Sequence, residues 1–184
     1  MYKLLIIFFI LNFNNPAFSS IKKKLITQIQ HTNNLSFNFI QTINNKSENG
    51  KCIIEYPKKI WCEYNNSNKK IIVSNGKSLV IKTSNKGSYY RYPLNKTPLE
   101  FLLDKKYLIS KIRTLKPREI DNKYLNFKFF ENNNEINIFF DKESLNLIGW
   151  QTEDIYQNLV VTFISSVKIN NKISDKIFIL PKNN

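Results

Sequence analysis

The sequence contains few glycines, few cysteines and a single histidine, and these shortages exclude several classes of function. Four glycines in 184 residues leave little material for the glycine-rich loops that cradle phosphates. Two cysteines and one histidine provide no cluster with the spacing of metal ligands. His31 has no accompanying motif that would place a nucleophile beside it, so a residue at the end of a surface helix is the simpler interpretation. We therefore expect no metal, no cofactor and no enzymatic activity.

Hydrophobic and basic residues, by contrast, are abundant. Hydrophobic residues make up 42% of the chain, enough for one domain with a substantial core. The 28 basic residues outnumber the 14 acidic ones, which gives a formal net charge of +14. The basic residues are 25 Lys and 3 Arg, beside 27 Asn and 26 Ile, and an A+T-rich coding sequence supplies Lys, Asn and Ile. We therefore expect no nucleic-acid partner; the alternative role of the charge is to attract anionic head groups or an acidic partner.

Residues 1–19 have the three parts of a secretory signal peptide. Lys3 precedes an apolar run over residues 4–10, and Ala17 and Ser19 are small residues at positions −3 and −1 of a cut after Ser19. The run is too short for a membrane span of about 20 residues, and the alternative is a buried helix. We expect residues 1–19 to be removed and residues 20–184 to form a single, soluble, exported domain. No cysteine near the cut offers a site for lipid attachment.

The first half of the mature chain predicts a helix followed by a meander of about six strands. Ser19 or Ser20 can cap the helix, which is expected to end near Asn33 and Asn34. From Leu35 the apolar residues alternate, as is typical of a strand. Asn75-Gly76 predicts a tight hairpin turn, and a loop is expected at 44–49. The expected strands begin at 35 and then cover 51–56, 60–64, 70–74, 77–83 and 88–92.

The second half predicts a helical insertion and further strands. Thr97 and Glu100 form a capping box with Pro98 at the first helical position, and the apolar residues 101–103 follow. The segment 105–116 fits either a helix or a strand. Strands are expected at 124–130, 136–141, 145–154 and 159–169, with a last short one at 178–180. The economical interpretation is a mainly β (α+β) fold, one antiparallel sheet with two apolar helical insertions.

Cys52 and Cys62 lie at positions of equal parity in a predicted hairpin, so both are expected on one face of the sheet. In an oxidising compartment they can form a disulfide if the register places them directly opposite each other. The alternative is two small buried hydrophobic residues.

The predicted elements carry more apolar surface than a flat sheet can cover. A sheet of about ten strands must curl. If it curls only part of the way and the helices cover the opening, an apolar cavity suited to acyl chains results. The alternative is that the same side chains fill a solid core.

An ordered set of short segments resembles the LolA family of periplasmic outer-membrane lipoprotein carriers. The segments are Phe39-Ile40-Gln41, residues 54–60, residues 73–79, residues 97–103 and residues 150–154. The resemblance implies an incomplete, unclosed antiparallel β-barrel with a helical lid over its concave face. It also implies a monomeric chaperone that takes acylated lipoproteins from an inner-membrane ABC transporter and delivers them to an outer-membrane receptor. The alternative is a periplasmic lipid-binding sensor or binding protein of the same fold without a transport role.

On this interpretation each part of the site can be assigned. The cavity is expected to be lined by Phe37, Phe39, Ile54, Tyr56, Ile60, Tyr64, Val73, Leu79 and Ile81. The lid is expected to contribute Leu25, Ile29, Leu99, Leu102 and Leu103.

The sequence departs from the family pattern in the hairpin. The family usually has an arginine before the hairpin proline, where its hydrogen bonds latch the closed lid, and here this residue is Tyr56. A later position that is usually tryptophan is Cys62, with Trp61 beside it, while Asn75 in place of aspartate preserves the turn chemistry. A phenol offers one donor where a guanidinium offers five, so the latch is expected to be weaker or rebuilt.

Overall fold

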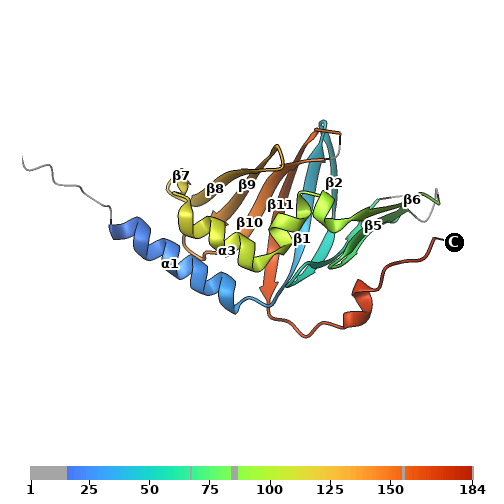
Figure 1. The fold of residues 1–184 in the computed structure, drawn as a ribbon, viewed down its shortest axis with the longest axis horizontal. Helices are drawn as coiled ribbons and strands as arrows, with labels where there is room; N and C mark the ends of the chain where they lie inside the picture. The colour runs from blue at the N-terminus through green and yellow to red at the C-terminus, as the bar shows by residue number, and fades with distance from the viewer. Residues whose placement is uncertain (1–15, 67, 84–86, 155, 184) are drawn as a thin grey trace, which may run out of the picture.

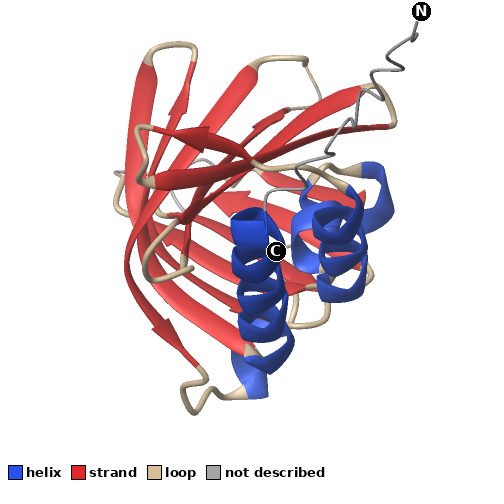
Figure 2. Cartoon of the chain, turned by 90° about the vertical axis from the view of Figure 1, so that its left-hand side faces the viewer, coloured by secondary structure: helices blue, strands red, loops and turns tan. Residues whose placement is uncertain are grey.

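The computed structural model describes residues 16–184 except 67, 84–86, 155 and 184. Its strands form one antiparallel sheet in the order β6-β5-β4-β3-β2-β1-β11-β10-β9-β8-β7. The end strands β6 and β7 do not pair with each other, so the sheet is unclosed, and it curves around the helices (Figures 1 and 2). The strands are β1 (Asn34–Ile43), β2 (Lys46–Glu55), β3 (Lys59–Tyr64), β4 (Lys70–Asn75), β5 (Ser78–Thr83), β6 (Tyr89–Pro93), β7 (Arg118–Ile120), β8 (Tyr124–Glu131), β9 (Asn134–Asp141), β10 (Leu147–Glu153) and β11 (Leu159–Ile169).

Asparagine, rather than glycine, makes several of the tight turns. Asn44 and Asn45 join β1 to β2 with φ values of 48° and 62°, and Asn132 and Asn133 join β8 to β9 with φ values of 50° and 64°. Asparagine tolerates this left-handed region better than most residues, and two such residues suit a two-residue hairpin turn. The predicted loop at 44–49 is therefore wrong, because β2 begins at Lys46 directly after the turn.

The α-helices of the described residues lie on one side of the sheet: α1 (Pro16–His31), α2 (Leu99–Leu103) and α3 (Lys105–Thr114). The ambiguous segment 105–116 is mostly α3, and the side chain of Asp104 caps it by accepting a 3.0 Å hydrogen bond from the Tyr107 main chain. Helix α1 begins before the predicted Ser19 or Ser20 cap, and most of the predicted signal peptide, residues 1–15, lies outside the described residues. Its removal after Ser19 remains a prediction.

The C-terminal segment does not add a strand. The predicted strand at 178–180 is wrong, because the 3₁₀-helix η2 (Asp175–Phe178) lies there, against β3 and β4. Pro181 follows and cannot donate to a strand ladder. The short edge strand β7, between Pro117 and the turn at Asp121 and Asn122, was not predicted.

Candidate lipid-binding cavity

Two cross-strand rows on the first half of the sheet face the helices. One row, in direct register from β1 to β5, is Phe37, Cys52, Cys62, Ile72 and Ile81. The other is Leu35, Ile54, Ile60, Ser74 and Leu79. Residues in register share a face of the sheet, and the buried apolar members of both rows belong to the hydrophobic core shared with the helices. The predicted residues Phe37, Ile54, Ile60, Leu79 and Ile81 thus lie on this concave face.

Cys52 and Cys62 form a disulfide within the first row. They are directly opposite in the β2–β3 register, with their Cα atoms 4.1 Å apart. The open choice between a bond and two free thiols is therefore decided by the register. A disulfide is consistent with a location outside the cytoplasm.

Phe39 and Tyr64 meet above a glycine. Their rings are 4.8 Å apart at 72°, in an edge-to-face arrangement. Gly50 lies between them in the register, and a Cβ there would be 2.9 Å from the Phe39 ring and 2.1 Å from Glu63 O. The hydroxyl of Tyr64 donates a 2.9 Å hydrogen bond to Gln41 Oε1, and burial raises the pKa of Tyr64. Both predicted aromatic residues therefore lie in the apolar interior between the concave face of the sheet and the helices, which we call the hollow.

Val73 does not line the concave face, which corrects one predicted cavity residue. It is in register with Trp61 and Val80, one position out of phase with Ile72. Val73 is buried for another reason, because η2 lies against β3 and β4. The ring of Phe178 in η2 lies 5.4 Å from Lys59 Nζ, and Lys59 is on the same face of β3 as Trp61 because the two are two residues apart. Val73 therefore belongs to a small core on the outer face.

The lid consists of α1, α2 and α3. All five predicted lid residues belong to the core shared with the sheet: Leu25, Ile29, Leu102 and Leu103 are buried and Leu99 is partly buried. Leu108 and Ile112 of α3 are equally buried but were not predicted, because the segment 105–116 was ambiguous.

The far wall of the hollow also escaped prediction. It comprises Leu125, Phe127, Phe129, Ile136, Ile138, Phe140, Trp150 and Ile164 from β8 to β11, all buried in the same core. Each residue falls on the alternation that already predicted the strands, and this alternation was the signal that could have identified them.

Helices α1 and α3 run antiparallel, and each supplies a lysine to the other's C-terminal carbonyl groups. Lys22 Nζ donates to Arg113 O at 2.8 Å, in the last turn of α3, and to Leu115 O at 3.1 Å, at its C-cap. At the other end, Lys105 Nζ donates to the carbonyl groups of residues 30 and 32 at 3.1 and 2.9 Å. A cation at a helix C-terminus is favourable because the carbonyl groups there are unpaired and carry partial negative charge. The two helices therefore form a unit.

The hairpin holds the lid through Lys58 rather than through Tyr56. Lys58 Nζ lies 2.8 Å from Glu100 Oε1 of α2 and 3.3 Å from Asp104 Oδ2, and its main-chain N–H donates to Leu103 O at 2.9 Å. Tyr56 is half-buried with Lys105 Nζ 5.7 Å from its ring centre, and burial raises its pKa to about 12. The ion pairs of Lys58 thus lie two residues along the chain from Tyr56.

A second ion pair joins α3 to the opposite side of the sheet. Lys111 pairs with Glu131 at the end of β8, and Lys111 Nζ lies over the rings of Tyr107 and Phe129 at 5.3 and 5.7 Å. The hydrogen bond from Lys111 lowers the pKa of Glu131. Burial beside this carboxylate raises the pKa of Tyr107.

The hollow is nearly filled in this closed form. The cavity between α1, α3 and the sheet measures about 30 Å³, far below the roughly 300–1,000 Å³ of small-molecule sites. Tyr56, Leu35 and Phe140 line it from the sheet, and Ile29 and Leu108 from the lid. The side chains of the lid therefore occupy the space that acyl chains would need.

The described part of the chain shows neither a metal centre nor a membrane span. Within residues 16–183, with the gaps noted above, no group of three or more His, Cys, Asp or Glu side chains could hold a metal ion. No helix in the same residues is long and apolar enough to cross a bilayer.

An unclosed antiparallel sheet with short helices over its apolar concave face defines the class of LolA-like folds. The chain belongs to one family of this class: the family profile of the outer membrane lipoprotein carrier protein LolA matches residues 30–180. LolA-family proteins are periplasmic, and the disulfide agrees with that location. A comparison with curated protein sequences gives no match.

Solved structures resemble the chain in fold alone. A conserved uncharacterized protein from Thermus thermophilus aligns with a TM-score of 0.53 and 6% identity, over 90% of this chain and 95% of that one. MucB aligns with a TM-score of 0.50 and 6% identity, over 92% of this chain and 65% of that one.

Proposed function

We propose that this protein carries acylated lipoproteins across the periplasm, from an inner-membrane ABC transporter to an outer-membrane receptor, as a soluble monomer released by signal-peptide cleavage. The observation that carries the proposal is an apolar interior filled by lid side chains that polar contacts hold in place. Membership of the LolA family supports the same role.

The energetics favour a lid that competes with its cargo. Each buried CH₂ contributes about 0.8 kcal/mol, so three chains of about 16 carbons would gain tens of kcal/mol if fully enclosed. Measured affinities end near −20 kcal/mol, and a carrier must also release its load. If loading first expels Leu25, Leu102 and Leu108 from the hollow, part of the acyl gain replaces lid packing and the net affinity stays moderate.

Two adjacent isoleucines of β4 provide the test. Ile72 faces the hollow in register with Cys62, whereas Ile71 faces outward in register with Glu63, and both are half-buried. A photo-crosslinking amino acid at Ile72 should capture acylated lipoprotein in living cells, while the same amino acid at Ile71 should not.

Crosslinking at these two positions tests the carrier role and the location of the binding site separately. Capture at neither position would overturn the carrier role. Capture at Ile71 alone, or equally at both, would overturn the assignment of the concave face. Mass spectrometry of the crosslinked species purified from these cells would show whether the captured partner carries acyl chains.

A further inference from the structure

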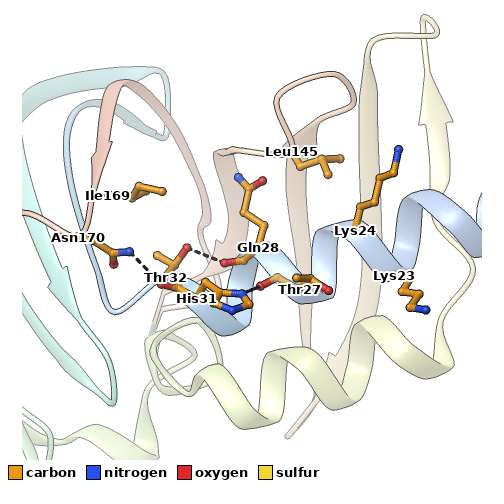
Figure 3. Close-up of a pocket in the computed structure, with 9 residues that line it drawn as sticks. All are labelled: Lys23, Lys24, Thr27, Gln28, His31, Thr32, Leu145, Ile169 and Asn170. Carbon is orange, nitrogen blue, oxygen red and sulfur yellow. Dashed lines mark hydrogen bonds between the residues drawn. The ribbon is translucent and has the colours of Figure 1, made fainter.

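A surface groove of about 530 Å³ lies outside the closed lid (Figure 3). Lys24, Gln28 and His31 of α1 form one wall, at the spacing that places residues on one side of a helix. Leu145, after β9, and Ile169, at the end of β11, form the other. None of the residues that line the groove is acidic. The groove is within the size range of small-molecule sites.

The inner end of the groove adjoins the hydrophobic core. Gln28, Thr32, Leu145 and Ile169 line both the groove and the small interior cavity. Between them, Gln28 Nε2 donates hydrogen bonds to Ser144 O at 3.2 Å and to Asn146 Oδ1 at 3.0 Å. The deepest part of the groove therefore combines two apolar side chains with one amide and one hydroxyl group, and it carries no charge.

Leu145 occupies its position at a conformational cost. Its φ is +58°, a left-handed conformation that glycine or asparagine adopts more readily than a leucine does. Asp141 fixes the turn, since its Oδ1 accepts 2.7 Å hydrogen bonds from both the main-chain N–H and the hydroxyl of Ser144. A strained apolar residue in a binding groove suggests that its side chain has a use there.

The outer end of the groove is positively charged. Lys23 and Lys24 are exposed, and neither makes an ion pair with any described residue. At the end of the groove away from these lysines, Asn170 Nδ2 donates to His31 O at 2.9 Å. An apolar trough that begins at two free cations complements an amphiphile with an anionic head.

We propose that this groove binds a lipid with a single acyl chain and an anionic head group, with its tail along Leu145 and Ile169 and its head beside Lys23 and Lys24. The groove lies outside the filled hollow, so a single acyl chain can bind there without movement of the lid. Because α1 is both one wall of the groove and part of the lid, the site belongs to the closed form.

Calorimetric titration with laurate, below its micelle concentration, tests the site against the uncharged ester monolaurin. The wild-type protein should bind laurate more tightly than monolaurin. Lys23→Gln combined with Lys24→Gln should weaken laurate binding by about three- to tenfold and remove the preference, because exposed charges contribute little each. Added salt should reduce the same preference.

Leu145→Asn is the decisive variant because asparagine tolerates the left-handed φ. It should still fold, because relief of the left-handed φ offsets part of the lost core packing, and it should bind both ligands about tenfold more weakly, since an apolar wall is lost. Ile179→Asn, which removes another apolar side chain that is 70% exposed, is the matched control and should bind as the wild type does. Unchanged binding by Leu145→Asn, or equal wild-type affinities for laurate and monolaurin, would overturn the proposal.

Discussion

Replacing Lys58 with alanine should loosen the lid without unfolding the sheet. Lys58 contacts Glu100 and Asp104 at 2.8 and 3.3 Å, and the three side chains are 31%, 19% and 28% exposed. Exposed ion pairs contribute about 0.2–1 kcal/mol, while breaking a fully buried pair costs about 3–5 kcal/mol. A value of about 1–2 kcal/mol is therefore expected at this intermediate burial, which shifts the equilibrium between closed and open lid by about 5- to 30-fold.

Native-state hydrogen exchange measures this shift directly. Amides of α2 and α3 should exchange faster by about the same factor, while those of β1 to β3 keep their rates. Lys51→Ala is the matched control, because Lys51 and Glu63 form a 2.9 Å pair on the sheet with side chains 59% and 46% exposed. Unchanged exchange in α2, or equal acceleration throughout the chain, would refute the role of Lys58 as a latch.

Three further predictions concern the sheet and its contact with α3. Replacing Cys52 and Cys62 with alanine should lower the free energy of unfolding by about 2–3 kcal/mol in denaturant titrations, and reductant should then have no effect. The hydrogen bond from Lys111 lowers the pKa of Glu131 in the folded protein, so the carboxyl group takes up a proton at higher pH in the unfolded chain than in the folded one. The stability that this ion pair contributes should therefore be full above about pH 5 and should be lost as the pH falls. Glu131→Gln should make the free energy of unfolding less dependent on pH in this acid range. Gly50→Ala should destabilise the fold by about 3 kcal/mol or more in thermal unfolding, because its Cβ would lie 2.1 Å from a β3 carbonyl oxygen; a normal melting temperature would contradict the packing described.

The sequence pattern predicted the sheet well because each strand buries mainly one face. Alternation identified Phe37 and Phe39 as residues of the hollow, and parity placed both cysteines on a common face of the sheet before the register was known. The same alternation at Phe127 and Phe129 predicted β8 but was not extended to the site. That omission was one of interpretation, since the information was present in the sequence.

Other features depend on contacts that are distant in sequence. Ile71, Ile72 and Val73 are consecutive apolar residues, so alternation could not determine which of them faces the hollow. The answer depends on η2, roughly one hundred residues later in the chain, which covers the outer face of β3 and β4. Likewise the segment 105–116 fitted two kinds of structure, and packing of α3 against α1 selects the helix.

The lid contacts also explain how the fold can dispense with the expected arginine. A guanidinium can form several directed hydrogen bonds from one residue, whereas an ammonium group acts as a point charge. Here Lys58 holds α2 to the β2–β3 hairpin and Lys111 holds α3 to Glu131 of β8, while Lys22 and Lys105 join α1 to α3 within the lid. Because these contacts lie far apart and share few partners, their contributions should add. No single contact then determines closure, so the loss of any one of them should loosen the lid only in part.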